Sequence, residues 1–326
     1  MIAVGTLSIT IKKDEFVPHN IGSYTLLQPM TSNKSGFSKW GFCRKNDKDY
    51  FIKEFLNPVY PLDSIDLSRE IRQKKIKQCE DWLAKKELIY KRIRKSQNGN
   101  LVPPIDLFRD GSHYYLVTDK VDEISVDCKA ISYFDMEHKL ILMKVLANSF
   151  SKLADNNVVH ADVKLDNLLL KKTKSGYYTI KIIDFDASFI ADDPPSGDEM
   201  QCDFVYLAPE TFLAMIDEPS DLTPKIDVFA MGIVFHQILS GEMPGFDKEY
   251  DYVYEAVLND AELFINKNIP PKFKVLLAYM LKKQPAERPS MRQVLTAIKA
   301  LEDDSLYAKK NAPKKPSALK IADDFD

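Results

Sequence analysis

Cysteine is scarce in this chain of 326 residues, and its spacing excludes two classes of site. The four cysteines, Cys43, Cys79, Cys128 and Cys202, lie far apart, without the short paired spacing of a metal site or a disulfide framework. We therefore expect reduced, mostly structural thiols and a cytoplasmic location. The N-terminus also lacks the basic region of a secretion signal.

Long hydrophobic runs and a strong charge of one sign are missing as well. The longest apolar run, residues 228–239, is too short to span a bilayer and is typical of a buried core helix. A net charge of -3 and a pI near 6.0 argue against a nucleic-acid binder. With 45% hydrophobic residues the chain can bury a substantial core, so we expect a globular protein with no membrane and no nucleic-acid partner. Nothing in the pattern indicates an oligomeric state.

The first third of the chain has the pattern of strands. Leu7, Ile9 and Ile11 alternate with polar residues, and residues 24–55 alternate around a turn-rich centre, which predicts antiparallel strands. Two further strands are predicted near residues 105–108 and 113–121. Between residue 55 and the strand near residues 105–108, residues 64–95 have apolar positions every three or four residues, which predicts one long helix.

Helical periodicity dominates after Asp135. A strand-rich part followed by a helix-rich part predicts an α+β protein with two lobes. We place an N-terminal extension at 1–20, an N-lobe at 21–121, a C-lobe at 122–302 and a mobile charged tail at 303–326.

Two short segments contain the residue types that phosphoryl transfer requires. Residues 158–170 read Val-Val-His-Ala-Asp-Val-Lys-Leu-Asp-Asn-Leu-Leu-Leu, and a later apolar strand ends in Ile-Ile-Asp-Phe-Asp. Asp162 can orient an attacking hydroxyl, and Lys164 can neutralise the transferring group. Asn167 and Asp184 supply oxygen ligands of the kind that Mg²⁺ prefers. Lys53, at the end of a predicted strand, can reach phosphate oxygens.

These residues resemble the eukaryotic-like (Hanks-type) Ser/Thr protein kinase family. His160 to Asn167 is similar to the catalytic loop His-Arg-Asp-Leu-Lys-x-x-Asn, and Asp184-Phe185-Asp186 is similar to Asp-Phe-Gly. Ala208-Pro209-Glu210 closes an activation segment, and Asp227 and Arg288 follow in the family order. The resemblance covers residues 24–301 and implies a small antiparallel β lobe with one long helix, plus a larger, mainly helical lobe.

The resemblance also implies a role for each matched residue. Asp162 becomes the catalytic base, Lys164 its charge partner, Asn167 and Asp184 the metal ligands, and Lys53 the phosphate-binding lysine. Structural support is implied for His160, Glu210, Asp227 and Arg288. ATP and Mg²⁺ are the implied cofactors and a protein the implied substrate.

Further contacts with ATP are implied by the alignment of the remaining segments. A glutamate of the long helix should hold Lys53, and we prefer Glu87 to Glu80 because an Asn-Leu-Val segment follows it at the family's distance. Thr118 takes the gatekeeper position, and the backbone of Asp119 and Val121 should meet adenine. The list of expected ATP contacts is completed by Leu169 and Gly36.

The chain departs from the family pattern at several positions. The phosphate loop is poor in glycine, and Phe51 replaces a small residue, so that Phe51 and Trp40 either stack on the base or crowd it out. Ala161 replaces the arginine that binds a phosphorylated activation loop, which predicts activity independent of such phosphorylation. Asp203 replaces a threonine and is expected to pair with Lys164.

Three functions therefore stay open on the sequence. The first is ATP- and Mg²⁺-dependent phosphoryl transfer to Ser or Thr of a protein substrate. The second is a pseudokinase scaffold or sensor, supported by Phe51 and the glycine-poor loop. The third is a small-molecule kinase similar to the antibiotic phosphotransferases, which share the His-x-Asp loop. Glu210, Asp227 and Arg288 weigh against it, because they resemble the architecture of kinases with protein substrates.

Overall fold

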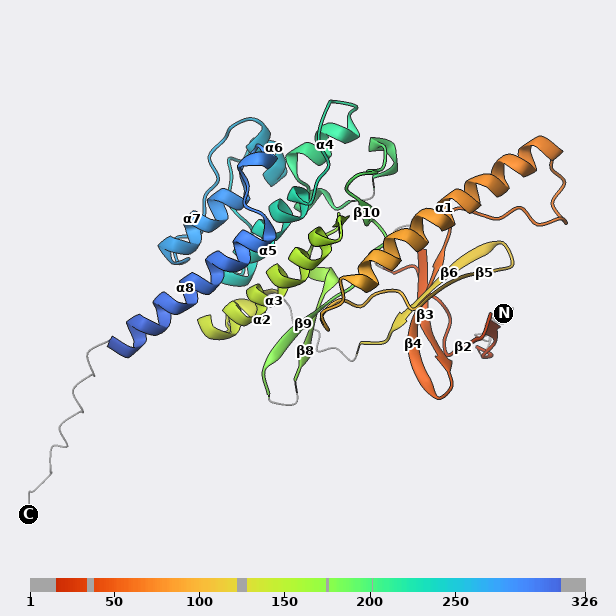
Figure 1. The fold of residues 1–326 in the computed structure, drawn as a ribbon, viewed down its shortest axis with the longest axis horizontal. Coiled ribbons are helices and arrows are strands. Elements are labelled where there is room, and N and C mark those ends of the chain that lie inside the picture. The colour runs from red at the N-terminus through yellow and green to blue at the C-terminus, as the bar shows by residue number, and fades with distance from the viewer. Residues whose placement is uncertain (1–15, 34–37, 122–127, 174–175, 201, 312–326) are drawn as a thin grey trace, which may run out of the picture. The chain divides into compact units, whose positions relative to one another are not determined.

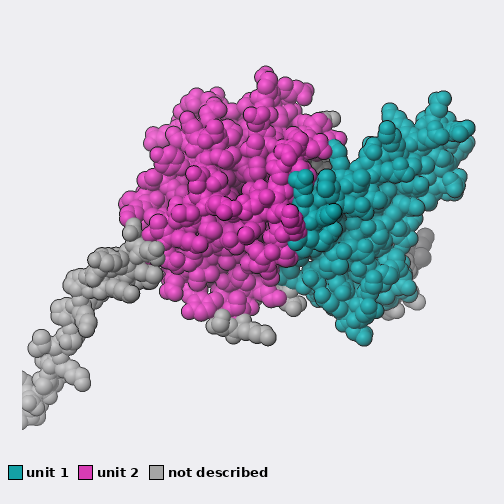
Figure 2. All heavy atoms as spheres, in the orientation of Figure 1, with its two compact units in different colours: residues 1–94, 102–122 teal, residues 95–101, 123–326 magenta. Residues whose placement is uncertain are grey.

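The chain divides into two compact units, which Figure 2 distinguishes by colour. The computed structural model describes residues 16–33, 38–121, 128–173, 176–200 and 202–311. One unit comprises residues 1–94 and 102–122, and the other comprises residues 95–101 and 123–326. The main division thus falls one residue after the predicted lobe boundary at residue 121, but residues 95–101 do not belong to the first unit as predicted.

Hydrogen bonds explain why residues 95–101 join the second unit. Leu101 pairs with Ile182 in a parallel bridge, and the Ile182 amide donates to the carbonyl of Asn100 at 2.8 Å. The Asn98 side chain donates to Ser149 at 2.9 Å. Because these partners are distant in the sequence, no local pattern could have assigned the segment.

The first unit is built on a six-stranded antiparallel sheet with the strand order β1-β2-β3-β4-β6-β5 (Figure 1). The strands are β1 (Asn20–Ile21), β2 (Tyr24–Leu26), β3 (Ser38–Lys45), β4 (Lys48–Phe55), β5 (Asp106–Asp110) and β6 (His113–Asp119). A two-residue turn, Asn46-Asp47, joins β3 to β4 with positive φ at both positions, as such hairpins require. The predicted antiparallel sheet is confirmed.

Both faces of this sheet carry apolar side chains. One face contributes Cys43, Ile52 and Val117 to a buried cluster with Tyr24 and Leu26. The other face meets the helix α1 (Arg69–Lys95), whose Trp82 lies 5.0 Å from the rings of both Phe55 and Tyr114. The predicted long helix is therefore present and packs through its apolar stripe.

The second unit is mainly helical, as predicted. Its helices are α2 (Cys128–Ser132), α3 (Met136–Asp155), α4 (Pro209–Met215), α5 (Lys225–Ser240), α6 (Val253–Leu258), α7 (Pro271–Met280) and α8 (Met291–Asn311). Two short sheets accompany them, β7 (Val158–Val159) with β10 (Phe189–Ile190) and β8 (Leu168–Lys172) with β9 (Tyr178–Ile182). The α+β fold with a small β lobe and a larger helical lobe is thus confirmed.

Helix α5 is the centre of the helical core. Every residue from Ile226 to Leu239 is buried, which confirms that the longest apolar run is a core helix. Across the part of the chain that the structure describes, no helix is long and apolar enough to cross a membrane.

The last helix is longer than predicted. Helix α8 continues to Asn311, whereas the sequence reading ended the helical lobe at residue 302. Leu, Ala and Lys, which favour helix, fill much of residues 301–310, and the first proline after the helix is Pro313. The helix thus continues past residue 303, where the predicted tail begins. Residues 312–326 lie outside the described residues, as do residues 1–15 of the predicted extension.

Candidate active site

The predicted catalytic loop lies between β7 and β8 in the second unit. Its end is a short 3-10 helix, Leu165–Asn167, which turns the buried side chain of Asn167 back toward Asp162. The Asn167 amide donates to the backbone carbonyl of Asp162 and to its carboxylate, both at 2.8 Å. Lys164 lies 3.0 Å from the same carboxylate. The three residues predicted for catalysis and metal binding in this loop are thus side by side.

Asp227 holds the start of this loop from the core helix α5. Its carboxylate accepts the backbone N–H groups of His160 at 2.9 Å and of Ala161 at 3.0 Å. Ala161 has a φ of 66°, in the left-handed region that residues other than glycine rarely adopt. Burial raises the pKa of Asp227, while His160 and the two N–H groups act in the opposite direction. Asp227 therefore stabilises an unfavourable backbone conformation immediately before Asp162.

His160 connects the loop to the strand that precedes Asp184. Its ring is fully buried between Phe150 and Phe185, with Nε2 3.2 Å from the carbonyl of Ile183. Nδ1 accepts the N–H of Asp162 at 3.3 Å, so the neutral ring must donate through Nε2. These contacts tie the His160 ring to the catalytic loop and to the residue before Asp184.

Asp184 follows the end of β9 after one residue, Ile183, and is placed by the same network. The Ile183 amide donates to the carbonyl of Asn167 at 3.0 Å, which ties the residue before Asp184 to the catalytic loop. Asp184 itself has a φ of 60°, a second left-handed position in this small region. Two strained residues at one site are a common mark of function.

Negative charge surrounds Lys164. Burial lowers the pKa of this lysine, but the nearby carboxylates of Asp162, Asp203 and Asp184 outweigh it and leave the pKa raised. Asp203 lies 3.6 Å from the ammonium, so the pairing expected from the sequence is present. Lys164 is therefore a fixed cation between the residues that would handle the reacting groups.

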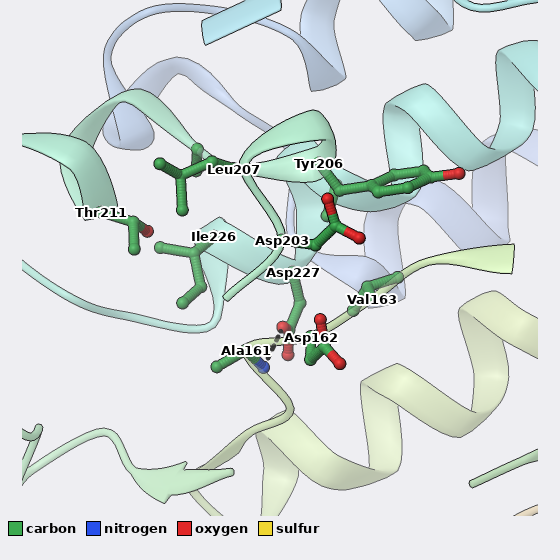
Figure 3. Close-up of a pocket in the computed structure, with 11 residues that line it drawn as sticks. Ala161, Asp162, Val163, Asp203, Tyr206, Leu207, Thr211, Ile226 and Asp227 are labelled. Carbon is green, nitrogen blue, oxygen red and sulfur yellow. Dashed lines mark hydrogen bonds between the residues drawn. The ribbon is translucent and has the colours of Figure 1, made fainter. Parts of the chain in front are cut away.

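A small pocket lies beside Ala161 and the carboxylates of the loop (Figure 3). Asp162, Asp203 and Tyr206 line one part of it, and Leu207, Thr211 and Ile226 line another. Asp203 also accepts the N–H of Val205 at 3.0 Å and so caps the turn that follows. With alanine at position 161, no long side chain fills this space.

A buried ion pair lies at the end of the segment that runs from Asp184 to Glu210. Glu210, at the start of α4, binds Arg288 through two contacts of 2.6 Å and 2.8 Å. Their side chains are 5% and 0% exposed, and Arg288 also donates to the carbonyls of Lys225, Lys282 and Lys283. The geometry is bidentate and charge-assisted, the strongest arrangement for such a pair. Glu210 and Arg288 thus form the support that the sequence suggested.

The segment between Asp184 and Glu210 packs on its own unit. Its strand β10 pairs with β7, next to the catalytic loop. Further along, a Cβ placed on Gly197 would lie only 2.0 Å from the carbonyl oxygen of Ala214 in α4. Only glycine permits such a close backbone approach, so Gly197 fixes the segment against α4.

The first unit contributes the predicted phosphate-binding lysine. Lys53 lies on β4, opposite Trp40 on β3 and Leu116 on β6, and is 7% exposed. Trp40, Phe42 and Phe51 lie on the same face of the sheet as Lys53, because directly paired residues share a face.

Both glutamates considered as the partner of Lys53 lie on the surface of α1. The side chains of Glu87 and Glu80 are exposed, and their contact with Lys53 stays a prediction. The face of α1 that packs on the sheet contains Cys79, Trp82 and Tyr90, and Lys86 continues this spacing. A shift of one residue on a helix rotates a side chain by about 100°, which turns Glu87 away from this face.

The remaining predicted contacts with ATP are placed as follows. Asp119 ends β6 with an exposed side chain paired to Lys48 at 2.5 Å, and Val121 follows it half-buried. Leu169 lies on β8, opposite Lys181. Gly36 lies outside the described residues.

The residues present fit a magnesium ion. Asn167 turns its NH₂ group toward Asp162, which leaves its side-chain oxygen available for a cation. Together with the Asp184 carboxylate this provides one amide and one carboxylate oxygen, the small protein set with which Mg²⁺ commonly binds substrate phosphates. Among the described residues no cluster of three or more His, Cys, Asp or Glu side chains suggests a different metal site.

Comparison with known families decides the assignment. The model of the "Protein kinase domain" family matches residues 67–297, which include α1, the catalytic loop, Asp184 and Arg288. The chain belongs to the protein kinase family. Lys53 and the first four strands precede the matched residues, so this kinase resembles the family model most clearly in its second unit.

Individual relatives are distant and longer. The kinase is 28% identical to "Protein kinase kin1" of Schizosaccharomyces pombe over 192 residues, which cover 58% of this chain and 20% of that protein. It is 30% identical to "Calcium-dependent protein kinase 4" of Plasmodium falciparum over 203 residues, or 60% of this chain and 37% of the other. Identity to "Calcium/calmodulin-dependent protein kinase type II" of Caenorhabditis briggsae is 24% over 267 residues, or 78% and 49%. The chain therefore spans half or less of the length of these relatives.

Proposed function

We propose that this kinase transfers the γ-phosphoryl group of ATP to a serine or threonine of a protein substrate, with Mg²⁺ as cofactor. The observation that carries the proposal is the contact set of Asp162 with Asn167 at 2.8 Å and with Lys164 at 3.0 Å. Lys164, two residues after the catalytic aspartate, favours Ser or Thr as the acceptor, and the similarity to Ser/Thr protein kinases agrees with this choice.

The geometry supports a role for each of these residues. Asp162 orients the acceptor hydroxyl and takes its proton, since its carboxylate is fixed by Asn167. Lys164 offsets the negative charge at this point. Magnesium, when held by Asn167 and Asp184, would neutralise charge on the phosphates. Lys53 would bind nonbridging phosphate oxygens from the first unit.

Independence from activation-loop phosphorylation is part of the proposal. Ala161 stands where the resemblance implies an arginine that binds the phosphate of the activation loop, and alanine has no charge. The pocket beside it is lined by Asp162, Asp203 and Asp227. A phosphate group there would meet negative charge. The segment is supported instead by the β10–β7 pairing and by the close packing of Gly197 on α4.

A pseudokinase is the second candidate, because one observation favours it. Trp40, Phe42 and Phe51 occupy the sheet face on which Lys53 lies, and their rings contact one another at 5.7–6.2 Å. The small-molecule kinase is a weaker alternative, because the buried pair of Glu210 and Arg288 agrees with the resemblance to protein kinases.

One experiment tests the function. The protein is incubated with ATP and Mg²⁺, alone and with a generic protein acceptor, and phosphate incorporation is measured by intact mass beside an Asp184→Asn variant. We expect incorporation on Ser or Thr by fragment mass analysis, unchanged by prior phosphatase treatment, and no incorporation by the variant. Equal incorporation by both proteins, or none by either, would reject the proposal. Incorporation on tyrosine would reject the acceptor assignment, and a large loss after phosphatase treatment would reject the independence.

A further inference from the structure

The sequence from residue 182 to residue 224 contains no basic residue. It has eleven aspartates and glutamates but no lysine, arginine or histidine, although the whole chain contains 45 lysines and arginines among its 326 residues. The net charge of the chain is only -3, so negative charge is concentrated in this part of the second unit. Such a local excess attracts cations and repels anions.

Asp203 is the acidic residue of this segment that shares a lysine with the catalytic aspartate. The carboxylates of Asp162 and Asp203 contact the same ammonium, that of Lys164, at 3.0 Å and 3.6 Å. Both aspartates also line the pocket shown in Figure 3. The Asp203 side chain is 34% exposed, and its carboxylate accepts the N–H of Val205 at 3.0 Å. Asp203 therefore presents a fixed and accessible carboxylate beside Asp162.

One lysine does not neutralise two carboxylates. Of the residues that the structure describes, Lys164 is the only cation within ion-pair distance of Asp162 or Asp203. The neighbouring Cys202 thiol responds to the remaining charge. Burial raises the pKa of this thiol to about 11, Asp162 and Asp203 add to the increase, and Lys164 opposes it only in part. A net negative charge is thus left at this point of the surface.

Apolar side chains lie next to the Asp203 carboxylate. Phe204 and Val205 follow it in the chain and are 41% and 40% exposed, and the Phe204 ring lies 5.9 Å from that of Tyr252. Lysine and arginine pack their aliphatic stems on apolar groups while the charged end reaches an anion. Arginine also stacks on aromatic rings. An exposed carboxylate with apolar neighbours therefore fits a basic side chain.

The reaction brings a polypeptide to this surface. Under the proposed function, on which this inference rests, the acceptor hydroxyl lies at Asp162. Successive Cα atoms are about 3.8 Å apart, so the side chains on either side of the acceptor residue can reach Asp203. The threonine that Asp203 replaces has no charge, so the attraction belongs to this chain in particular.

We propose that Asp203 is a specificity-determining residue, and that the kinase selects acceptor sequences with arginine or lysine next to the serine or threonine that receives the phosphate. The basic group pairs with the Asp203 carboxylate, and its stem lies against Phe204 and Val205. The same charge repels an acidic neighbour of the acceptor.

Peptide substrates test this selection on the unchanged protein. Three peptides share one serine in a neutral background and differ only at the two flanking positions, which are arginine, glutamine or glutamate. Initial rates with ATP and Mg²⁺ give kcat and KM for each peptide. We expect kcat/KM to be at least about tenfold higher for the arginine peptide than for the glutamate peptide, mainly through KM, because a charge contact outside the reacting atoms acts on binding. The difference should shrink in about 0.5 M NaCl, which screens exposed charges.

Substitution of Asp203 tests whether this residue carries the preference. Asp203→Asn removes the charge and keeps an oxygen that can accept the N–H of Val205, so the ratio between the two peptides should fall toward one. Asp203→Glu, which keeps the charge, should restore the ratio. Asp217→Asn, at an exposed carboxylate of the same segment outside the pocket lining, is the control and should keep it. The ratio is measured on one protein, so a uniform loss of rate does not affect it.

Two results would overturn the inference while the proposed function stands. Equal kcat/KM for the arginine and glutamate peptides, or a preference for glutamate, would show that the surface does not select basic sequences. A preference that Asp203→Asn leaves unchanged would show that Asp203 does not determine it. Failure of all three peptides to accept phosphate, together with failure of the generic protein acceptor, would instead reject the proposed function, and this inference with it.

Discussion

The two units differ in how closely they keep the features that protein kinases share. In the second unit, Asp162, Lys164 and Asn167 contact one another, and Asp227 and His160 fix the loop that contains them. In the first unit, Lys53 is present, but the two glutamates expected to hold it are exposed on α1, and three aromatic rings share its face. The chemistry is therefore retained more strictly than the means of holding the nucleotide.

The contrast has a physical reason. Groups that act on charge in a transition state must be placed within a fraction of an ångström, which needs a dense hydrogen-bond network. Base binding depends on stacking and burial, which tolerate many side chains. Under the proposed function, we therefore expect substitutions in the first unit to alter nucleotide binding and substitutions in the second unit to remove activity.

Among the predictions that test this comparison between the two units, the substitution of Asp184 has the largest expected effect. Asp184→Asn removes a carboxylate proposed to bind metal, and we expect phosphoryl transfer to fall by at least about a hundredfold, because charge stabilisation dominates such reactions. Initial rates with a generic protein acceptor measure the loss. Asp193→Asn, an exposed carboxylate of the same segment, should keep the rate of the unchanged protein. Full activity of Asp184→Asn would show that the second unit does not hold the essential charge.

The second prediction concerns the stability of the helical unit. Arg288→Met leaves Glu210 buried without its cation, which should lower the free energy of unfolding by about 3–5 kcal/mol. Urea denaturation followed by far-ultraviolet circular dichroism measures this change. Replacing both partners, as Arg288→Met with Glu210→Leu, should recover part of it.

A surface pair provides the control for Arg288. Arg292 binds Asp155 at 2.7 Å but is 71% exposed, so Arg292→Met should cost less than about 1 kcal/mol. Because both tryptophans lie in the first unit, their emission records whether that unit is disturbed. Similar losses in the free energy of unfolding for Arg288→Met and Arg292→Met would mean that the buried Glu210 pair stabilises the unit no more than an exposed ion pair does.

A third, smaller effect tests the packing of the segment before Glu210. Gly197→Ala places a methyl group against the Ala214 carbonyl and forces the backbone apart, at a cost of about 1–3 kcal/mol. Limited proteolysis should then cut near residues 190–200 more readily. Gly41→Ala is the control, since its added methyl would meet Leu26 and Met30 at an ordinary 3.4 Å. Equal protease resistance of both variants would remove the role assigned to Gly197.

The smallest effect is a pH dependence that belongs to the second unit. His236 is fully buried, with Nδ1 2.7 Å from the carbonyl of Glu242 and Nε2 accepting the N–H of Asn266 at 3.1 Å. Burial lowers the pKa of this ring, and Glu242 opposes the shift only in part. The folded protein therefore binds a proton less readily than the unfolded chain, and stability falls as the pH drops below about 6.5.

Unfolding curves between pH 7.5 and pH 5 measure this dependence. One histidine contributes at most about 1.4 kcal/mol per pH unit, and His236→Gln should reduce the slope by part of that amount. His19→Gln, at an exposed histidine, should leave the slope as it is. An unchanged slope in His236→Gln would exclude this ring as a source of acid sensitivity.

The catalytic loop could be predicted because its functional residues are close together in the sequence. Asp162, Lys164 and Asn167 lie within six positions, so the local turn brings them together. Glu210 and Arg288 are far apart, and only the order of the family motifs linked them. The α+β fold and the antiparallel sheet were likewise predictable from periodicity.

Other features depend on details that a pattern does not contain. The choice between Glu87 and Glu80 required the rotation of α1 about its axis, and both turned out to be exposed. Phe42 was missed beside Trp40 and Phe51, because the register of β3 against β4 is set by the turn at Asn46-Asp47. The assignment of residues 95–101 depended on distant hydrogen bonds.

The burial of α5 has a consequence for the synthesis of this protein. From Ile226 to Leu239 the helix has no polar face, so it cannot be stable in water alone. Its neighbours include α2, which is made earlier, and α7 at residues 271–280, which is made later. When α5 has left the ribosome but α7 has not yet been synthesised, the apolar surface of α5 that α7 later covers is therefore exposed. We expect the growing chain to need a chaperone during this interval, before any question of nucleotide or substrate arises.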